Sequence, residues 1–496
     1  MAALTLWTTT PRAQPAEPAE ASRETTEGET FDLDAGGELG YARLDQRNWV
    51  APTLAADLRL AALQSAIRIP IRFRFDTGDV REKDWDEPSD YFRVAQCTRI
   101  DFSSMGRFER ERGLCQPWQV QRDDYYFTAR MGPLYDLSLG HGTIVSSYSG
   151  NLNPDHFEPG LLAELQLHEF VHGRVTLDNV TRPSLVGGFL SLLPFAYELP
   201  ETRQWFEETS HLRIEATAVS DLGAPDEVLT AFGRPLADES NNLLYTTAPV
   251  TVVGGDLEYV YAFGRQLRAA VHADWNWITG HGMGGHGQAQ FVYNHPDGIY
   301  SVRTQGELRF VQRNYIPSYF DSYYDIQRQQ YALAGEARER LERGDEDLVT
   351  KREFLESLTD DSWDPGVQGS LELEAFRGTG TDRRRAFRAR AFLGDTFGRQ
   401  GDGQFVVTAE MPRLGDKIDL YALYSRQNFD TIADLVKLDD TLVKLRVRWD
   451  LAAKIYVLLT YGRLWQLQTR ADGTTDRGFQ SSNDFNVSLG YAEELQ

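Results

Sequence analysis

The histidines of His168-Glu169-Phe170-Val171-His172 have the spacing of a zinc-peptidase signature. In the H-E-x-x-H pattern the two histidines bind one zinc ion and the glutamate acts on the zinc-bound water. This chemistry requires a helix, which brings positions i and i+4 to one face. The flanking residues instead alternate apolar and polar side chains with period two. On a strand the histidines would lie about 13 Å apart, unless a turn forms at Glu169 and Phe170. The pattern favours strands and keeps a zinc-dependent hydrolase using His168, Glu169 and His172 as an alternative.

Two stretches rich in glycine and histidine also carry side chains that could do chemistry. Gly140-His141-Gly142, followed by Asn151, Asn153, Asp155 and His156, is typical of an active-site loop or of a turn at a barrel rim. Gly280 to His286 could bind a metal weakly, but its composition is also that of a flexible hairpin loop. The sequence contains neither a G-x-S-x-G elbow nor a phosphate-binding glycine loop before a helix. We therefore assign no catalytic residue and expect no cofactor.

The overall charge excludes one class of partner. The chain has 51 basic and 74 acidic residues among 496, a net charge of −23, so we expect no nucleic acid to bind. Hydrophobic residues make up 41 % of the chain. No apolar run approaches the roughly 20 residues that a membrane-spanning helix needs. A helical membrane protein is excluded, whereas a membrane barrel, whose strands alternate over about 10 residues, is not.

Period-two alternation runs through most of the chain. It is clearest in Ile67 to Phe75, where every odd position is a large apolar residue and three of the four even positions are Arg. A strand sorts such a pattern into one apolar and one cationic face. Similar segments recur from about residue 53 to 491 without a clear linker. We count about 18 of them, within a range of 16 to 20.

The arginines on the polar faces are the main candidates for function. In a barrel with a water-filled lumen they would face inward, and rings of Arg lower the barrier to anions. Alternatively, they pair with Glu164, Glu215, Glu307, Glu372 and Glu374 across neighbouring strands and only hold the wall together. The lumen-lining candidates are Arg68, Arg72, Arg74, Arg93, Arg99, Arg174, Arg268, Arg303, Arg309, Arg388, Arg390, Arg446 and Arg448.

Two soluble sandwich domains or one membrane barrel would both fit this pattern, and the aromatic residues favour the barrel. Aromatic side chains lie near segment ends, where interfacial girdles occur: Tyr91, Phe92, Tyr125, Tyr126, Trp275, Tyr315, Trp449, Trp465 and Tyr491. The last segment, Phe485 to Tyr491, resembles the final strand of Gram-negative outer-membrane β-barrels, although five further residues follow it. Among these barrels, an Arg-lined 18-strand monomer is most similar to exopolysaccharide and alginate exporters. The resemblance implies a cell outer membrane location, a lipid bilayer partner and periplasmic export components.

The remaining segments set the expected boundaries. Residues 1–14 resemble the tail of a secretory signal peptide, residues 15–50 a disordered or extended lead-in, and residues 51–496 the barrel. A helical insertion is expected around 332–358, either as a solvated excursion or as a plug over the lumen. Cys97 and Cys115 could form a disulfide or remain free thiols.

These observations predict an all-β protein: a single antiparallel transmembrane barrel that acts as an outer-membrane channel or export pore for polar, anionic solutes or polysaccharide. A non-conducting structural barrel of an envelope machine is the other alternative to the zinc-dependent hydrolase.

Overall fold

The computed structural model describes residues 31–495, apart from 45–46, 61–62, 104–124, 135, 153–156, 168–169, 195–211, 232–233, 239–241, 264–265, 332–347, 379–383, 398–402, 416, 430, 432, 434, 436–440, 453 and 470–474. Within these residues one antiparallel sheet of twenty strands closes into a barrel. It closes because β1 pairs with β27, from Leu33↔Leu495 to Arg43↔Phe485. The predicted all-β barrel is confirmed, at the upper end of the expected strand count.

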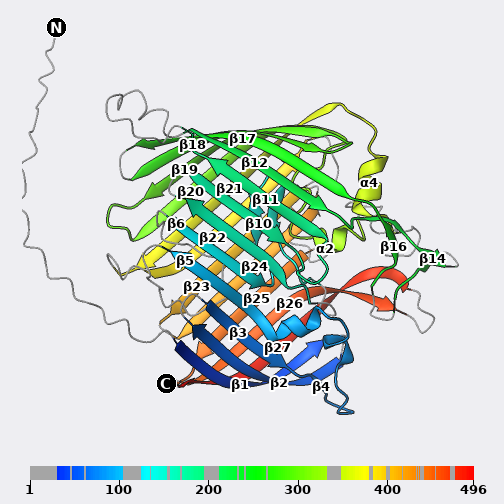
Figure 1. Ribbon diagram of the computed structural model, residues 1–496, viewed down its shortest axis with the longest axis vertical. Coiled ribbons are helices and arrows are strands. Elements are labelled where there is room, and N and C mark those ends of the chain that lie inside the picture. The colour runs from blue at the N-terminus through cyan, green and yellow to red at the C-terminus, as the bar shows by residue number, and fades with distance from the viewer. Residues whose placement is uncertain are drawn as a thin grey trace, which may run out of the picture.

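Each spanning strand pairs with the spanning strand before and after it in the chain (Figure 1). The strands are β1 (Phe31–Leu44), β2 (Arg47–Leu60), β3 (Leu63–Pro70), β5 (Ala95–Ser103), β6 (Tyr125–Gly132), β9 (Gly160–Leu167), β10 (Val171–Leu177), β11 (Leu185–Leu192), β12 (Leu212–Asp221), β17 (Val250–Phe263), β18 (Leu267–Ile278), β19 (Met283–Asn294), β20 (Tyr300–Gln312), β21 (Trp363–Arg377), β22 (Arg384–Thr396), β23 (Gly403–Leu414), β24 (Ile418–Phe429), β25 (Thr441–Asp450), β26 (Ile455–Thr469) and β27 (Thr475–Leu495).

Short elements lie in the connections. They are the 3₁₀ helices η1 (Glu82–Asp84) and η2 (Asp90–Val94), the strands β4 (Phe73–Arg74), β7 (Leu137–Leu139), β8 (Val145–Tyr148), β13 (Pro225–Val228), β14 (Thr230–Ala231), β15 (Arg234–Pro235) and β16 (Tyr245–Thr247), and the helices α2 (Tyr324–Gln327) and α4 (Lys351–Ser357). No helix in the described residues is long and apolar enough to cross a membrane.

The structure differs from the sequence prediction at the start of the barrel. The sheet begins at Phe31, not at residue 51, because β1 and the first residues of β2 (residues 47–50) occupy part of the expected lead-in. The alternating positions 33, 35, 37, 39 and 41 of β1 include Ala35 and Gly37, whose small side chains hide the period-two signal. The predicted strand Ile67 to Phe75 is also interrupted. Strand β3 ends at Pro70, which has no N–H to donate to the ladder, and β4 follows separately.

Other predicted features fall outside the described residues. These are the segments 1–14 and 332–347, residues His168 and Glu169, and Cys115, together with the side chain of Cys97. Of the predicted helical insertion, the described part forms α4.

The two faces of the sheet have opposite polarity. In β18 the side chains of Val271, Trp275 and Trp277 are exposed outward, whereas His272 and Asp274 are buried inside. Strand β20 repeats this, with Leu308 and Phe310 exposed and Glu307 and Arg309 buried. The period-two alternation therefore places apolar side chains outside and polar side chains inside, as in a membrane barrel.

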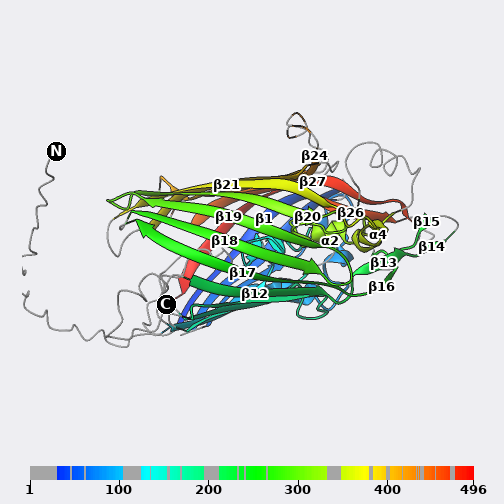
Figure 2. The same ribbon diagram turned by 90° about the horizontal axis from the view of Figure 1, so that it is seen from above.

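The two ends of the barrel differ. The start of β1, the end of β27 and the short turn between β19 and β20 lie at one end (Figure 1). The other end carries α2, α4 and β13 to β16 (Figures 1 and 2). We call these the turn end and the loop end.

Two connections fold inward at the loop end. The β6–β9 connection contributes the hairpin β7–β8, and the β20–β21 connection contributes α2. The amide of Ser318 donates to the carbonyl of Thr143 (2.9 Å), and Phe320 donates to Ile144 (3.2 Å), so the two connections are joined. Their Leu139, Tyr148, Tyr315, Phe320 and Tyr324 form one apolar core. That core also includes inward residues of the wall: Leu185, Val219, Val252, Ile278 and Val311.

Candidate functional site: a constricted lumen

The inward-folded β20–β21 connection reaches two well-separated parts of the wall. On one side, the hydroxyl of Tyr324 donates to Asp221 of β12 (2.7 Å). On the other, the hydroxyl of Tyr323 donates to the carbonyl of Ser425 on β24 (2.7 Å). Gln327 bonds Gln427 of the same strand (2.6 Å). Because β12 and β24 are eight strands apart in the sheet order, the connection crosses the lumen and constricts it.

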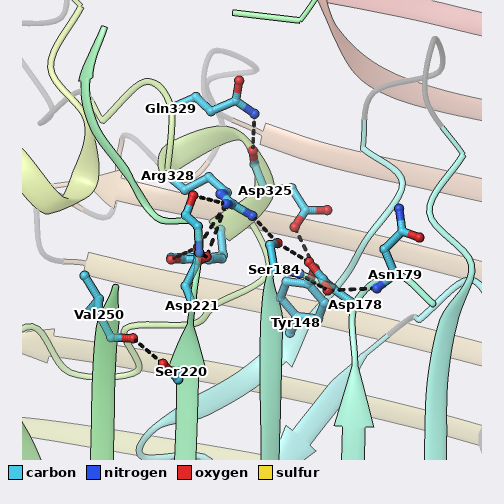
Figure 3. A network of polar contacts seen from close by, with 12 residues as sticks. Tyr148, Asp178, Asn179, Ser184, Ser220, Asp221, Val250, Asp325, Arg328 and Gln329 are labelled. Carbon is cyan, nitrogen blue, oxygen red and sulfur yellow. Dashed lines mark hydrogen bonds and ion pairs between the residues drawn. The ribbon is translucent and has the colours of Figure 1, made fainter. Parts of the chain in front are cut away.

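Arg328, just after α2, anchors this constriction to the wall. Its guanidinium donates to Ser184 (2.7 Å), to the carbonyl of Gly223 (2.9 Å) and to Asp221 (3.2 Å), as Figure 3 shows. The Asp221 carboxylate is fully buried. Removing one partner of a buried ion pair leaves an uncompensated charge, so the position of Arg328 is strongly determined.

A carboxyl on α2 faces a strongly acidic neighbourhood. Asp325 accepts a hydrogen bond from the Tyr148 hydroxyl of the β7–β8 hairpin (2.7 Å). Burial raises the pKa of Asp325 to about 7, and the nearby Asp178 adds to the shift, whereas the Tyr148 bond and Arg328 oppose it. The second oxygen of Asp325 is buried and has no hydrogen-bond partner. The constriction therefore contains a carboxyl that changes charge near neutral pH.

Most of the predicted arginines lie on the inner wall, and many of them are neutralised there. Arg388 lies 3.0 Å from Glu372, Arg174 lies 3.0 Å from Glu164, and Arg309 bonds Gln368 (2.6 Å) beside Glu307. Other inward arginines with acidic neighbours are Arg68 (Asp57, 2.7 Å), Arg303 (Glu372, 3.9 Å) and Arg448 (Asp450, 3.0 Å). Arg99 is buried on β5. For these side chains, the cross-strand pairing considered from the sequence describes most of the wall.

Three candidates lie instead in the β3–β5 connection. Arg72 bonds Asp84 (2.6 Å), Arg74 pairs with Asp76 (2.7 Å), and Arg93 of η2 bonds Asp90 (3.1 Å). Arg74 belongs to the short strand β4, which pairs with β2 in the barrel sheet (Trp49↔Arg74), whereas Arg72 and Arg93 lie outside the strands. That these three arginines line the lumen stays a prediction. These arginines hold the connection together.

A third group of arginines faces inward without a close ion pair. Within the described residues, Arg268, Arg390 and Arg446 have no ion pair within 4 Å, and Arg268 and Arg446 are exposed. The alternation of side chains along each strand places them inside. On β25 the even-numbered Leu442 is fully buried and the odd-numbered Trp449 is exposed outward, so Arg446 faces inward. On β22 Phe392 is buried and Leu393 is exposed, so Arg390 faces inward as well. Inward side chains that remain exposed indicate that water reaches the lumen away from the constriction.

The side chains on the outer surface indicate whether lipid or water surrounds the barrel. Large apolar side chains are exposed on many of the spanning strands, among them Leu54, Val271, Leu308, Leu371 and Leu489. A water-soluble protein rarely exposes such a continuous apolar surface, whereas a lipid-facing wall consists of it. Exposed aromatics lie near both ends, including Tyr125, Phe263 and Trp449 at one end and Trp275 and Trp363 at the other. The protein is an outer-membrane β-barrel.

The predicted aromatic girdle is confirmed in part. Tyr125, Trp275, Trp449 and Tyr491 are exposed on the outside of the outer-membrane barrel. Tyr126 instead points inward and Tyr315 lies in the apolar core of the constriction. Tyr91 and Phe92 belong to η2 rather than to a strand end.

Among known proteins, only solved structures show similarity to this chain. No protein family and no curated protein matches the sequence. The barrel is similar to OccK9 (OpdG) from Pseudomonas aeruginosa, with 9 % identity over 94 % of this chain and 98 % of that chain and a TM-score of 0.31. The FrpB iron transporter from Neisseria meningitidis is 7 % identical over 94 % of this chain and 81 % of that chain, with a TM-score of 0.31. CdiB from Acinetobacter baumannii is 6 % identical over 93 % of this chain, with a TM-score of 0.27. The chain spans 60 % of CdiB, which is less than two thirds of its length. Our assignment of the outer-membrane barrel rests on closure and on the polarity of its faces.

The zinc-peptidase pattern spans a turn in this barrel. Strand β9 ends at Leu167, Phe170 lies in a turn, and β10 begins at Val171. His172 bonds Glu164 of the facing strand (2.7 Å). Residues 160–167 and 171–177 are strands, so the helix that this signature requires does not form.

The second histidine-rich stretch forms a hairpin turn. Gly280 to Gly282 join β18 to β19, and Gly280 has a φ of +82°, which favours glycine. His286 lies inside β19 and bonds Glu307 (2.8 Å), apart from His281 in the turn. The predicted hairpin turn is therefore limited to residues 280–282, whereas Met283 to His286 belong to β19.

Sequence reasoning missed the side chains that form the constriction. Tyr148, Asp221, Asp325 and Arg328 carried no motif. One signal was available: the run Tyr315 to Tyr324 contains five aromatic residues within a long inter-strand connection. Aromatic side chains are costly to leave in water, so such a run indicates a connection that packs against something.

The lipid-facing assignment predicts a position-dependent effect of charge on β21. Leu371 lies mid-strand and is 53 % exposed outward. Leu371→Arg should lower the free energy of unfolding by about 2–4 kcal/mol, because it places a charge near the bilayer midplane. The measurement is urea unfolding in lipid vesicles, with inward-facing Ser370→Arg as the matched control. Equal effects for the two variants would contradict the assignment.

Proposed function

We propose that the protein is a constricted outer-membrane channel for small polar solutes, with a preference for anions. The observation that carries the proposal is a set of inward arginines that form no ion pair within 4 Å with a described residue: Arg268, Arg390 and Arg446. Of these, Arg390 is opposite Glu372 on the neighbouring strand. An unpaired Arg keeps its charge at all physiological pH values and lowers the barrier to anions. The paired arginines contribute little, because their fields are cancelled locally.

The orientation follows from the two ends. Outer-membrane barrels have short periplasmic turns and longer extracellular connections. We therefore place the loop end outside the cell and the turn end, with the start of β1 and the end of β27, in the periplasm. The constriction then lies on the extracellular side, and Arg268, near the turn end, on the periplasmic side.

The constriction favours small solutes over polysaccharide as cargo. A polymer would require both inward connections to leave the lumen, and these share an apolar core and several buried hydrogen bonds. Small ions and metabolites require only local openings. The export of an anionic polymer would need a large rearrangement at the loop end.

Planar-bilayer recording tests the proposal. We expect the purified barrel to conduct, with a reversal potential in a KCl gradient that indicates anion preference. Arg446→Glu and, separately, Arg390→Gln should shift the reversal potential toward cations. Arg182→Glu, in the exposed turn between β10 and β11, is the charge-matched control and should leave the reversal potential near its original value. A silent barrel would support the structural alternative, and a conducting barrel whose selectivity ignores Arg446 would refute the anion preference.

A further inference from the structure

A second cluster of titratable side chains lies where the β7–β8 hairpin meets the wall. His141 is at the hairpin tip between Gly140 and Gly142, whose φ values of +56° and +84° are ones that glycine adopts readily. A Cβ at Gly140 would lie 3.0 Å from the Thr217 hydroxyl of β12, so a larger residue would crowd this approach. The two glycines thus let the histidine reach the inner wall.

The wall presents four metal-ligating side chains to this histidine. They come from three adjacent strands: Glu215 from β12, Asp256 and Glu258 from β17, and His272 from β18. Further bonds fix the hairpin tip. Thr143 donates to Asp274 of β18, and Ser318 donates to the carbonyl of Gly142 (3.0 Å).

The ligand atoms form two groups of three that share His141, and the atoms of each group lie within 4.8 Å of one another. Nε2 of His141 lies 3.0 Å from Nδ1 of His272, 3.5 Å from Oδ1 of Asp256 and 3.6 Å from Oε2 of Glu258. Nδ1 of His272 lies 3.5 Å from the same Glu258 oxygen, and Oε2 of Glu215 lies 3.7 Å from His141. Ligands bound tetrahedrally to zinc at about 2.0–2.1 Å are separated by about 3.3 Å. Most of these distances exceed hydrogen-bond lengths yet suit a shared cation.

One buried oxygen of the cluster also lacks a hydrogen bond. Oδ1 of Asp256 lies 3.5 Å from Nε2 of His141 and has no hydrogen-bond partner, although Asp256 is only 8 % exposed. Buried polar atoms are normally satisfied, and each exception calls for an explanation. The three carboxylates face two imidazoles and one cation, Arg213 of β12. With neutral imidazoles the cluster therefore keeps an excess of negative charge that a metal ion would offset.

We propose that His141, His272 and Glu258, next to Asp256 and Glu215, bind one divalent transition-metal ion of the zinc class. Imidazole and carboxylate ligands together favour zinc and similar ions, whereas calcium and magnesium prefer oxygen ligands alone. The ion fastens the β7–β8 hairpin to β17 and β18, and so holds the constriction in place. Metal binding to the folded state alone would make this arrangement depend on metal concentration.

The test uses the full-length barrel in detergent, freed of metal by a chelator and titrated with Zn²⁺ alone. We expect one ion per chain by calorimetry and by elemental analysis, and a tetrahedral absorption spectrum with Co²⁺. His141→Ala and Glu258→Gln should each weaken Zn²⁺ binding at least 100-fold. Heat-modifiable gel mobility shows whether each variant still forms a barrel. His141 is in a connection, so its variant should keep the barrel.

Two control variants locate the ion. His286→Gln removes a buried histidine of the neighbouring strand β19, and His172→Ala removes the described histidine of the H-E-x-x-H stretch. Both should keep stoichiometric Zn²⁺. Loss of the ion in His172→Ala with retention in His141→Ala would overturn the proposal. Absence of stoichiometric binding to the folded wild-type barrel would overturn it as well.

Discussion

Arg328→Ala should turn a constricted barrel into one with a several-fold larger and noisier conductance. The substitution leaves Asp221 buried without its cation, and it also removes the bonds to Ser184 and to the Gly223 carbonyl. Breaking a buried ion pair in this way costs about 3–5 kcal/mol. The cost falls on the inward conformation of the β20–β21 connection, because in the open conformation Asp221 can be hydrated. Single-channel recording measures the effect.

The matched control for Arg328 is in the same connection. Arg313 pairs with Asp360 (2.9 Å) and Asp364 (3.1 Å), but its side chain is half exposed. Exposed ion pairs contribute about 0–1 kcal/mol, so Arg313→Ala should leave the conductance nearly unchanged. Both variants should retain the heat-modifiable mobility of a closed barrel. If Arg328→Ala conducts like the wild type, the connection does not obstruct the path of ions.

Raising the pH from 4 to 8 should open the channel progressively, through ionisation of Asp325. Its pKa in the inward conformation is about 7, above the ordinary value of 3.8. The inward conformation therefore binds the proton more tightly, and its stabilisation is complete below about pH 4. The stabilisation falls between pH 4 and 7 and is lost above about pH 7. Since one pKa unit corresponds to about 1.4 kcal/mol, the full change is at most about 4 kcal/mol.

Two amide variants isolate this carboxyl. Asp325→Asn cannot ionise yet still accepts the Tyr148 hydrogen bond, so its open probability should be nearly independent of pH. Asp297→Asn, in the exposed β19–β20 turn at the other end of the barrel, should keep the wild-type pH profile. Open probability and limited proteolysis of the β20–β21 connection both report the change. A pH profile that survives in Asp325→Asn would assign the effect to other groups.

The sequence alone determined the strands and their two faces. Alternation is a local property of an extended backbone, so Val271 and His272 already divide into an outer and an inner side chain in the sequence. Closure was favoured, over two sandwich domains with the same strand pattern, by the absence of a clear linker, by the charged polar faces and by the aromatic residues near segment ends. The ends of individual strands were predicted less accurately. At Pro70 the alternating pattern continues, but β3 ends there because proline has no N–H to donate to the neighbouring strand.

Only the tertiary structure decided which inward side chains meet. Arg388 is neutralised and Arg446 is not, because each arginine's partners depend on the register of strands across the sheet. Tyr148 and Asp325 are 177 positions apart, and His141 and His272 are 131 apart. No local periodicity connects such residues. Their contacts form only when two connections fold into the lumen. The apolar core that holds these connections includes residues of several wall strands, so it exists only in the closed barrel.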